Sequence, residues 1–341
     1  MNRFSYHRAD TVEDAVRALS AEPSAKIIAG GTNLVDLMKY DVEKPSTLID
    51  ITRIEALKDI VEKDGGALHI GALAPNSAVA YDERVNAHFP LLASAILAGA
   101  TPQLRNAATT GGNLNQRTRC YYFNDAQTPC NKREPGTGCP AIGGLNRIHA
   151  ILGASEHCIA THPSDMCVGL AALGAEAHVI GPGGDRIIDF SDYHRLPGDA
   201  PQRDTTLEAS EIVVAIVLPQ QSRSYAKHYS YLKLRDRLSY AFALVSVAAA
   251  LEMDGGSITS ARIALGGVAH KPWRRLDAEA ALAGRVAGHA AFADAAELLL
   301  AGAVGHEHNA FKIDLARRAI IRALAQAAAG TPQSQTDKRI A

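Results

Sequence analysis

The chain has 341 residues, 47% hydrophobic and 21% charged, so it can bury a substantial core and is long enough for two or three domains. Its 35 basic side chains balance 36 acidic ones without forming a polybasic block, which argues against nucleic acid as a partner. No run approaches the roughly 18 apolar residues of a membrane span, and the first residues lack the apolar core of an export signal. We therefore expect a folded globular protein with no membrane insertion and no signal of its own.

Helix and strand patterns alternate through the first hundred residues. A threonine followed by helical apolar spacing predicts a helix over 11–22, and a second helix over 88–100 ends at Gly99. Short apolar runs closed by turn residues predict strands at 25–29, 46–51 and 67–73. This alternation indicates a mixed α and β fold.

Two glycine turns carry the same chemistry about 80 residues apart. The first, AGGTNL, spans 29–34, and the second, TTGGNLN, spans 109–115. Adjacent glycines let backbone N–H groups approach an anion closely, so the pair would suit a ligand with a diphosphate or two polar regions. A tight turn capped by Asn or Thr explains a single such turn equally well. A third segment, THPSD, places Asp165 before a helix, where it either caps the helix or binds ligand hydroxyls.

Four of the five cysteines, Cys120, Cys130, Cys139 and Cys158, lie in a Pro- and Gly-rich segment too irregular for a helix or strand. One thiol-rich segment in a large core-forming chain differs from a disulfide-stabilised secreted protein, so metal ligation is favoured. Four thiolates suit a [4Fe–4S] cluster or zinc, and the absence of two close cysteine pairs favours iron–sulfur. Buried or free thiols remain the alternative.

Other metal-binding side chains lie near these cysteines in the sequence. His149, His157 and His162 could replace a cysteine ligand, although most histidines in such a segment are only hydrogen-bonded. Cys167 falls inside a predicted helix among Val168 and Leu170, so we expect it to be a small core residue.

Beyond the cysteines the chain predicts a helix and a strand over 164–181, then a passage rich in Pro, Gly and Asp at 196–204. That passage indicates an exposed loop near the start of a second domain. Further strands or buried runs follow at 211–219, 225–235, 242–253 and 257–268. An amphipathic helix is predicted over 314–329, and the last residues are polar.

The segments AGGTNL, TTGGNL and THPSDM resemble the flavin-binding signatures of the FAD-binding subunits of the molybdenum hydroxylases, such as xanthine dehydrogenase and carbon monoxide dehydrogenase. The resemblance covers nearly the whole chain. It implies an α+β fold, with a two-subdomain FAD-binding domain of the vanillyl-alcohol-oxidase and p-cresol-methylhydroxylase type and a C-terminal α+β domain. The implied boundaries are 1–185 for the FAD-binding domain, with subdomains 1–57 and 58–185, then 190–330 for the C-terminal domain and 331–341 for a polar tail.

The resemblance also implies which residues bind FAD. Backbone N–H groups of both turns, with Thr32, Asn33 and Asn113, would hold the diphosphate and ribityl region, and Asp165 would bind ligand hydroxyls. Lys233 would lie beside the flavin, where a cation stabilises the anionic reduced ring, unless it is an exposed strand lysine. The implied FAD-binding residues are Ala29, Gly30, Gly31, Thr32, Asn33, Leu34, Thr109, Thr110, Gly111, Gly112, Asn113, Asn115, Asp165 and Lys233.

Within this family the cysteine-bearing segments resemble the flavin subunits of bacterial periplasmic aldehyde oxidoreductases, which carry an additional [4Fe–4S] cluster that most members lack. The resemblance implies a cluster-binding insertion at 117–160 with the ligands Cys120, Cys130, Cys139 and Cys158. It assigns no catalytic residue to this chain, because the sequence offers nothing to hold a molybdenum cofactor.

The resemblance implies a heterotrimer with a molybdenum-cofactor catalytic subunit and a small [2Fe–2S] subunit. Electrons would arrive from these partners, collect on FAD and leave to an external acceptor. We expect export to the periplasm with a partner that bears a twin-arginine signal, and a cytoplasmic location without that partner. The alternatives are the FAD subunit of a related molybdenum hydroxylase with another substrate, and a zinc-stabilised scaffold that binds a nucleotide.

Overall fold

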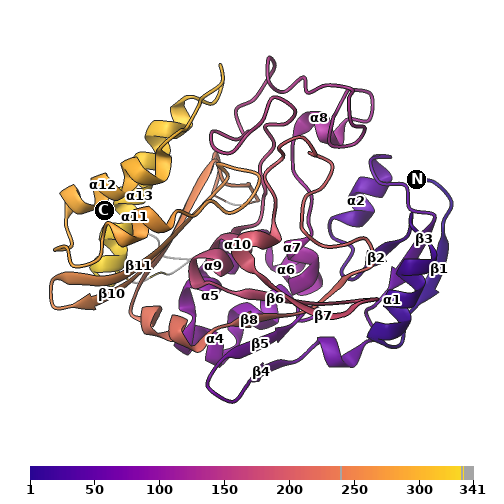
Figure 1. Ribbon diagram of the computed structural model, residues 1–341, viewed down its shortest axis with the longest axis horizontal. Helices are drawn as coiled ribbons and strands as arrows, with labels where there is room; N and C mark the ends of the chain where they lie inside the picture. Colours follow the sequence, from indigo (N-terminus) through magenta and orange to yellow (C-terminus); the bar gives the residue numbers. More distant parts are fainter. Residues whose placement is uncertain (239, 332, 334–341) are drawn as a thin grey trace.

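The computed structural model describes residues 1–341 except 239, 332 and 334–341. Figure 1 shows an N-terminal layer of helix and sheet, a central sheet with helices, and a C-terminal sheet covered by helices. The α+β class expected from the sequence is confirmed. Most of the polar tail expected at 331–341 lies outside the described residues. In the described part of the chain, no helix is both long and apolar enough to cross a membrane.

The N-terminal layer is a small parallel sheet. Its strands are β1 (Ser5–Arg8), β3 (Thr47–Asp50) and β2 (Lys26–Ile28), in that spatial order. The crossover helix α1 (Val12–Ala21) begins at Thr11, whose hydroxyl accepts the N–H of Asp14, and its buried face packs against this sheet. The helix and strands predicted at 11–51 are therefore confirmed. After β2 the chain makes the first glycine turn and enters α2 (Leu34–Lys39).

The central sheet has five strands with antiparallel neighbours. Their spatial order is β4 (Ile60–Glu62), β5 (Leu68–Gly71), β8 (Ile212–Leu218), β6 (Glu176–Gly181) and β7 (Gly184–Asp189). Its apolar side chains share the largest core with two helices, α5 (Pro90–Ala98) and α9 (Asp165–Leu173). The predicted end of α5 at Gly99 is confirmed.

Short helices complete this central region. They are η1 (Glu55–Leu57), α3 (Asn76–Tyr81), α4 (Glu83–His88), α6 (Pro102–Ala107), α7 (Thr110–Leu114), α8 (Tyr121–Asn124), α10 (Phe190–Tyr193) and η2 (Gln220–Ala226). The segment 117–160 was expected to be irregular throughout, but α8 forms one helical turn in it.

The pairing of strand β8 indicates the position of the boundary between the two domains. The strand lies inside the range 190–330 expected for the C-terminal domain, yet it pairs with β5 and β6 of the central sheet. Its alternating side chains also reach two cores of the N-terminal half. We therefore propose that the domain boundary lies after β8, between Leu218 and His228.

The C-terminal sheet is antiparallel, with β9 (His228–Leu234), β10 (Val245–Asp254) and β11 (Ser257–Gly266) in the order β11-β10-β9. Alternate residues of β10 enter different cores: Val247 packs with the C-terminal helices, and Ala248 packs with the core of α5 and α9. Burial of both faces explains the continuous apolar run in this strand. The covering helices are α11 (Leu276–Ala280), α12 (His289–Leu300) and α13 (Phe311–Ala328). The strands and late helix predicted here are confirmed, whereas α12 was not predicted.

Candidate functional site

A cavity of about 1180 Å³ opens between the N-terminal layer, the helices of the central region and the C-terminal sheet. Both glycine turns line it, together with the residues before α9 and the end of β9. Of the fourteen residues expected to bind FAD, thirteen line this one cavity. Thr110 is the exception, because its buried hydroxyl donates to the Ala74 carbonyl at 3.0 Å. The structure thus brings together residues that lie up to 204 positions apart, from Ala29 to Lys233.

The first glycine turn leaves donors free toward this cavity. Gly31 has a φ of +69°, a left-handed conformation that favours glycine. In the described residues, the N–H groups of Gly31, Thr32 and Asn33 donate to no protein acceptor. The Asn33 side chain accepts the N–H of Arg117 at 2.8 Å through Oδ1, while its buried Nδ2 has no partner within the described chain. A ligand in the cavity would satisfy these donors.

Gly30 has a different role from the one expected. A Cβ at this position would lie 1.9 Å from the carbonyl oxygen of Ala107, in the chain just before the second turn. The two turns are therefore packed backbone against backbone. Gly30 is required by this protein contact, whether or not a ligand is bound.

The second turn uses most of its N–H groups inside the protein. The N–H of Thr110 donates to Ala74 at 2.9 Å, and the N–H of Gly111 donates to Ala72 at 2.8 Å. The N–H of Gly112 donates to the capping hydroxyl of Thr109 at 3.2 Å. The sequence predicted that both turns offer N–H groups to an anion; in the described structure the N–H groups of Thr110, Gly111 and Gly112 are already bonded within the protein.

Asp165 and Lys233 form a buried ion pair on the cavity wall. The Lys233 Nζ donates to Asp165 Oδ2 at 2.8 Å and to the Ala98 carbonyl at 3.1 Å. The hydroxyl of Tyr231 donates to Asp165 Oδ1 at 2.7 Å, and burial, with the nearby carboxylate, raises the pKa of Tyr231 well above its ordinary value. The Lys233 side chain is only 4% exposed, which excludes the alternative of an exposed strand lysine. Both Asp165 oxygens are already engaged by protein donors.

The four clustered cysteines surround a second, much smaller pocket. Cys120 and Cys158 are buried, Cys130 and Cys139 are partly exposed, and all four are free thiols. Burial raises the pKa of Cys120 to about 12 and that of Cys158 to about 11. It raises the pKa of Cys139 as well. Without a cation beside them, the thiols of Cys120, Cys139 and Cys158 are therefore protonated at neutral pH.

Around these thiols, polar side chains form the hydrogen bonds to backbone groups that a helix or sheet would otherwise form. Asn131 accepts the N–H groups of Gly136 at 3.1 Å and Gly138 at 2.8 Å, and its Nδ2 donates to the carbonyl of His157 at 3.0 Å. Arg133 donates to the carbonyls of Tyr122 and Phe123. Each bond satisfies a backbone group that no helix or sheet would satisfy here.

A buried charge network connects this segment to the passage at 196–204. Asp204 accepts from Lys132 Nζ at 2.5 Å and from Arg117 Nε at 2.7 Å, and it lies 3.3 Å from His270. Arg117 also donates to Glu43 at 2.5 Å. Burial acts to raise the pKa of Asp204, but Lys132 and Arg117 hold it well below its ordinary value. The sequence suggested only an exposed loop here, and nothing in its local pattern indicated a network.

The three histidines proposed as alternative ligands lie in different places. His149 is 1% exposed, and its Nε2 lies 3.1 Å from the sulfur of Cys120. His157 lines the thiol pocket with its side chain partly exposed. His162 lies at the large cavity, away from the four thiols. Cys167 is fully buried in α9, as expected of a core residue.

Comparison with known families covers nearly all of the chain. The model for the FAD binding domain in molybdopterin dehydrogenase matches residues 2–221, and the model for the CO dehydrogenase flavoprotein C-terminal domain matches residues 228–327. These matches confirm an FAD-binding domain followed by a C-terminal flavoprotein domain.

Individual proteins agree with the family models. The chain is 48% identical over 330 residues to the aldehyde oxidoreductase FAD-binding subunit PaoB of Escherichia coli (strain K12), covering 96% of this chain and 99% of that protein. A solved carbon monoxide dehydrogenase from Hydrogenophaga pseudoflava is similar with a TM-score of 0.75 and 28% identity, covering 96% and 98% of the two chains. Quinoline 2-oxidoreductase from Pseudomonas putida 86 is similar with a TM-score of 0.73 and 27% identity, with the same coverage.

Proposed function

We propose a specific role for this chain, which belongs to the family of FAD-binding subunits of the molybdenum hydroxylases. It is the FAD and [4Fe–4S] electron-transfer subunit of a molybdenum-dependent aldehyde oxidoreductase. One observation carries the cluster assignment: four cysteines from an irregular segment surround a single pocket. The likeness to an aldehyde oxidoreductase subunit along almost the full chain supports the choice of substrate class.

The large cavity fits FAD in size and in chemistry. We assign the FAD diphosphate to the first turn, because Gly31, Thr32 and Asn33 offer unpaired N–H groups and the buried Asn33 Nδ2 lacks a partner within the described chain. At the second turn we assign close backbone approach at Gly112, where an added Cβ would meet only the Thr109 hydroxyl at 2.9 Å. When bound, FAD would supply one- and two-electron chemistry.

We assign Asp165 and Lys233 a joint role toward the flavin. Because each side chain satisfies the other, the pair can remain buried at the cavity wall without a ligand. Lys233 presents its charge to the cavity from a rigid strand, and the Asp165 carboxylate holds its ammonium in place. Asp165 would then bind ligand hydroxyls while it keeps its bond to Lys233.

The spacing of the four thiols favours an iron–sulfur cluster over zinc. Among the described residues no three of the four thiols lie close enough to share a single metal ion. A tetrahedral zinc site needs sulfur atoms about 3.8 Å apart, because each Zn–S bond is about 2.3 Å long. A four-iron cluster is larger and holds its ligands farther apart. The buried ammonium of Lys132 lines the same pocket and favours the thiolate form of Cys158.

The proposal places the chemistry of aldehyde oxidation on partners. A molybdenum-cofactor subunit and a small [2Fe–2S] subunit would form a heterotrimer with this chain, deliver electrons to it and leave it to reduce an external acceptor. We also propose that the folded chain reaches the periplasm by co-export with a partner that carries a twin-arginine signal. Fractionation of cells that express the partner with and without its signal tests this location.

The absorption spectrum of anaerobically purified protein, with its iron and flavin content, tests the cofactors. We expect a yellow-brown protein with about one FAD and four iron atoms per chain, from the proposed cofactor set. A colourless protein that contains zinc would instead favour the nucleotide-binding scaffold. A yellow protein without iron would favour the other alternative, in which the chain is the FAD subunit of a related molybdenum hydroxylase.

Dye reduction tests the division of labour. The isolated chain, loaded with its cofactors, should pass electrons from an artificial reductant to a dye or quinone but should not oxidise aldehydes. Aldehyde-dependent dye reduction should return only when the two partner subunits are added. Comparable aldehyde turnover by the chain alone would overturn the electron-transfer assignment.

A further inference from the structure

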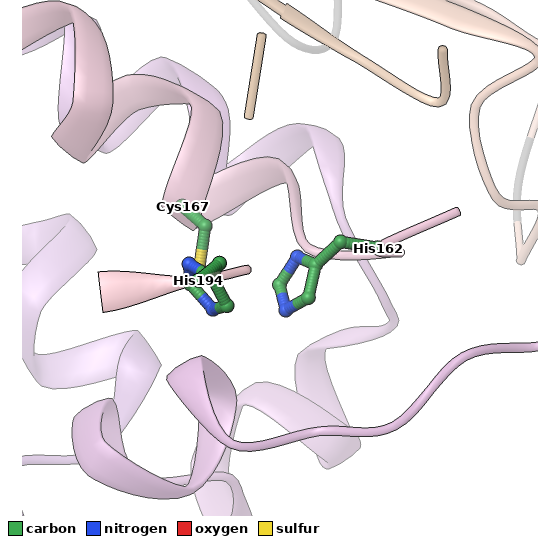
Figure 2. A group of neighbouring side chains, drawn as sticks. All are labelled: His162, Cys167 and His194. Atoms are coloured by element: carbon green, nitrogen blue, oxygen red, sulfur yellow. The ribbon is translucent and has the colours of Figure 1, made fainter. Parts of the chain in front are cut away.

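Two histidines and one cysteine meet in the buried interior beside the FAD cavity. Figure 2 shows the rings of His162 and His194 side by side, with the sulfur of Cys167 next to them. One potential ligand atom from each residue lies within 4.8 Å of the others. In the part of the chain that the structure describes, this is the only group of three or more such side chains close enough to share a metal ion.

Both rings point the same nitrogen at one backbone carbonyl. The Nε2 atoms of His162 and His194 lie 3.4 Å and 2.9 Å from the carbonyl oxygen of Leu114. A carbonyl oxygen only accepts, so each neutral ring donates from Nε2 and carries its lone pair on Nδ1. Metal-binding histidines are commonly oriented by a second N–H bond of this kind. The carbonyl thus fixes both rings and leaves Nδ1 of each as the nitrogen with a lone pair for a ligand.

The Nδ1 atoms are poorly satisfied by the protein. His194 is 2% exposed, and its Nδ1 has no hydrogen-bond partner among the described residues. His162 Nδ1 accepts only a long bond, 3.4 Å, from the N–H of Ser164. An unpaired buried acceptor is unfavourable. Burial lowers the pKa of His194 to about 4 and holds the pKa of His162 well below its ordinary value, so both rings are neutral and able to ligate.

We propose that His162, Cys167 and His194 bind one thiophilic metal ion, zinc or copper. Two imidazoles and a thiolate match the ligand preferences of both ions, and a trigonal set of two histidines and one cysteine is characteristic of copper centres. Binding displaces the Cys167 proton to solvent, so one proton is released for each ion bound. Ligand atoms around such an ion lie roughly 3.5 Å apart, so the three side chains, whose ligand atoms lie within 4.8 Å of one another, would move closer on binding.

The ion would hold the second glycine turn in place. His162 precedes α9, Cys167 lies in the first turn of α9, and His194 follows α10. Their shared carbonyl belongs to Leu114, the last residue of α7, which carries the glycines. This site does not involve the four clustered thiols, so it stands independently of the proposed iron–sulfur cluster.

Metal analysis of the complex, purified without chelators, tests the site. We expect about one equivalent of zinc or copper per chain in addition to iron, and electron paramagnetic resonance after oxidation distinguishes copper from silent zinc. Cys167→Ala and His194→Gln should lose this ion and keep their iron, whereas Cys130→Ser should lose iron and keep this ion. Circular dichroism checks that the variants are folded.

A titration of the native complex covers the case in which the variants do not fold. After chelator treatment, the complex should take up one equivalent of added zinc or copper(I) and release one proton. No uptake, or undiminished uptake by folded Cys167→Ala, would overturn the site and leave a hydrogen-bonded thiol and imidazole group only.

Discussion

The two pockets of this protein are built on opposite principles. The large cavity is walled by regular helices and strands, and two of its charged groups, Asp165 and Lys233, neutralise one another. The thiol pocket lies in a segment with a single helical turn, and its cysteines are held by side chains that bond to backbone groups. The Asp165–Lys233 pair is satisfied by the protein alone, whereas Cys120, Cys139 and Cys158, whose pKa values burial raises, need a cation to become thiolates.

This difference concerns what each pocket requires from its cofactor. The cavity offers donors on a scaffold that the core already stabilises, so loss of FAD should leave the fold largely intact. The thiol segment has only a small apolar core, of which the thiols are themselves part, and burial raises the pKa of Cys120. Loss of a metal cluster should therefore loosen this segment first.

Replacement of the clustered cysteines should have the largest effect. Cys120→Ser, Cys130→Ser, Cys139→Ser or Cys158→Ser removes one of four proposed ligands, so nearly all cluster iron should be lost. Cys167→Ser is the matched control, because Cys167 is buried in α9 away from the thiol pocket. Iron analysis and the absorption spectrum measure the loss. Unchanged iron content in all four variants would show that these cysteines do not ligate a cluster, and the proposed difference between the two pockets would be wrong.

Breaking the buried ion pair should come next. Lys233→Met leaves the Asp165 carboxylate buried without its cation, and the free energy of unfolding should fall by about 3–5 kcal/mol. The double variant Asp165→Asn with Lys233→Met should lose less, because it removes both charges. Urea unfolding of the FAD-free proteins measures both. Equal losses in the single and double variants would show that the pair does not stabilise the cavity wall.

A side chain at Gly112 should weaken FAD binding selectively. Gly112→Leu fills space at the cavity edge, where an added Cβ meets only the Thr109 hydroxyl, so FAD affinity should fall by roughly tenfold or more, about 1.4 kcal/mol. Gly143→Leu is the control, because an added Cβ there contacts nothing within 4 Å. Gly30→Ala should instead destabilise the FAD-free fold through the Ala107 carbonyl. Flavin content and urea unfolding together separate the two effects.

The last expected effect is a change of stability with pH that comes from Lys312. This fully buried lysine of α13 donates to the carbonyls of His149 and Gly267, and burial lowers its pKa from 10.5 to about 7. Between these pH values the unfolded chain binds more protons, so Lys312 makes the protein more stable as pH rises, by at most about 1.4 kcal/mol per pH unit. Lys312→Met should flatten unfolding free energy against pH in this window. Parallel curves for both proteins would contradict the shift.

Local patterns predicted most of the fold. The threonine cap of α1, the end of α5 at Gly99 and the apolar runs of β10 and β11 all follow from neighbouring residues, and each was confirmed. The domain boundary was harder, because β8 reads as one more apolar strand and nothing local shows that its pairing partners are β5 and β6. Strand pairing over such separations is a tertiary property.

The candidate site was predicted in composition but not in its contacts. Asp165 and Lys233 were each expected near the ligand, yet their pairing depends on bringing the first residue of α9 to β9, 68 residues later. The sequence likewise could not show that the N–H groups of the second turn are bonded to Ala72 and Ala74. The network at Asp204 is similar, because its partners come from two distant segments, Arg117 and Lys132 from 117–160 and His270 from beyond β11.

The position of Lys233 and Tyr231 has a consequence for the order of assembly. Asp165 belongs to the domain that is synthesised first, and its two partners lie on the first strand of the domain that follows. Domains generally fold in order during synthesis. The Asp165 carboxylate therefore lacks its partners Lys233 and Tyr231 until β9 has left the ribosome. The FAD cavity then gains its last wall only when the C-terminal sheet docks. Flavin loading is therefore expected to be a late event in biogenesis, and a chain that stops at residue 221 would have the glycine turns without the pocket that they serve.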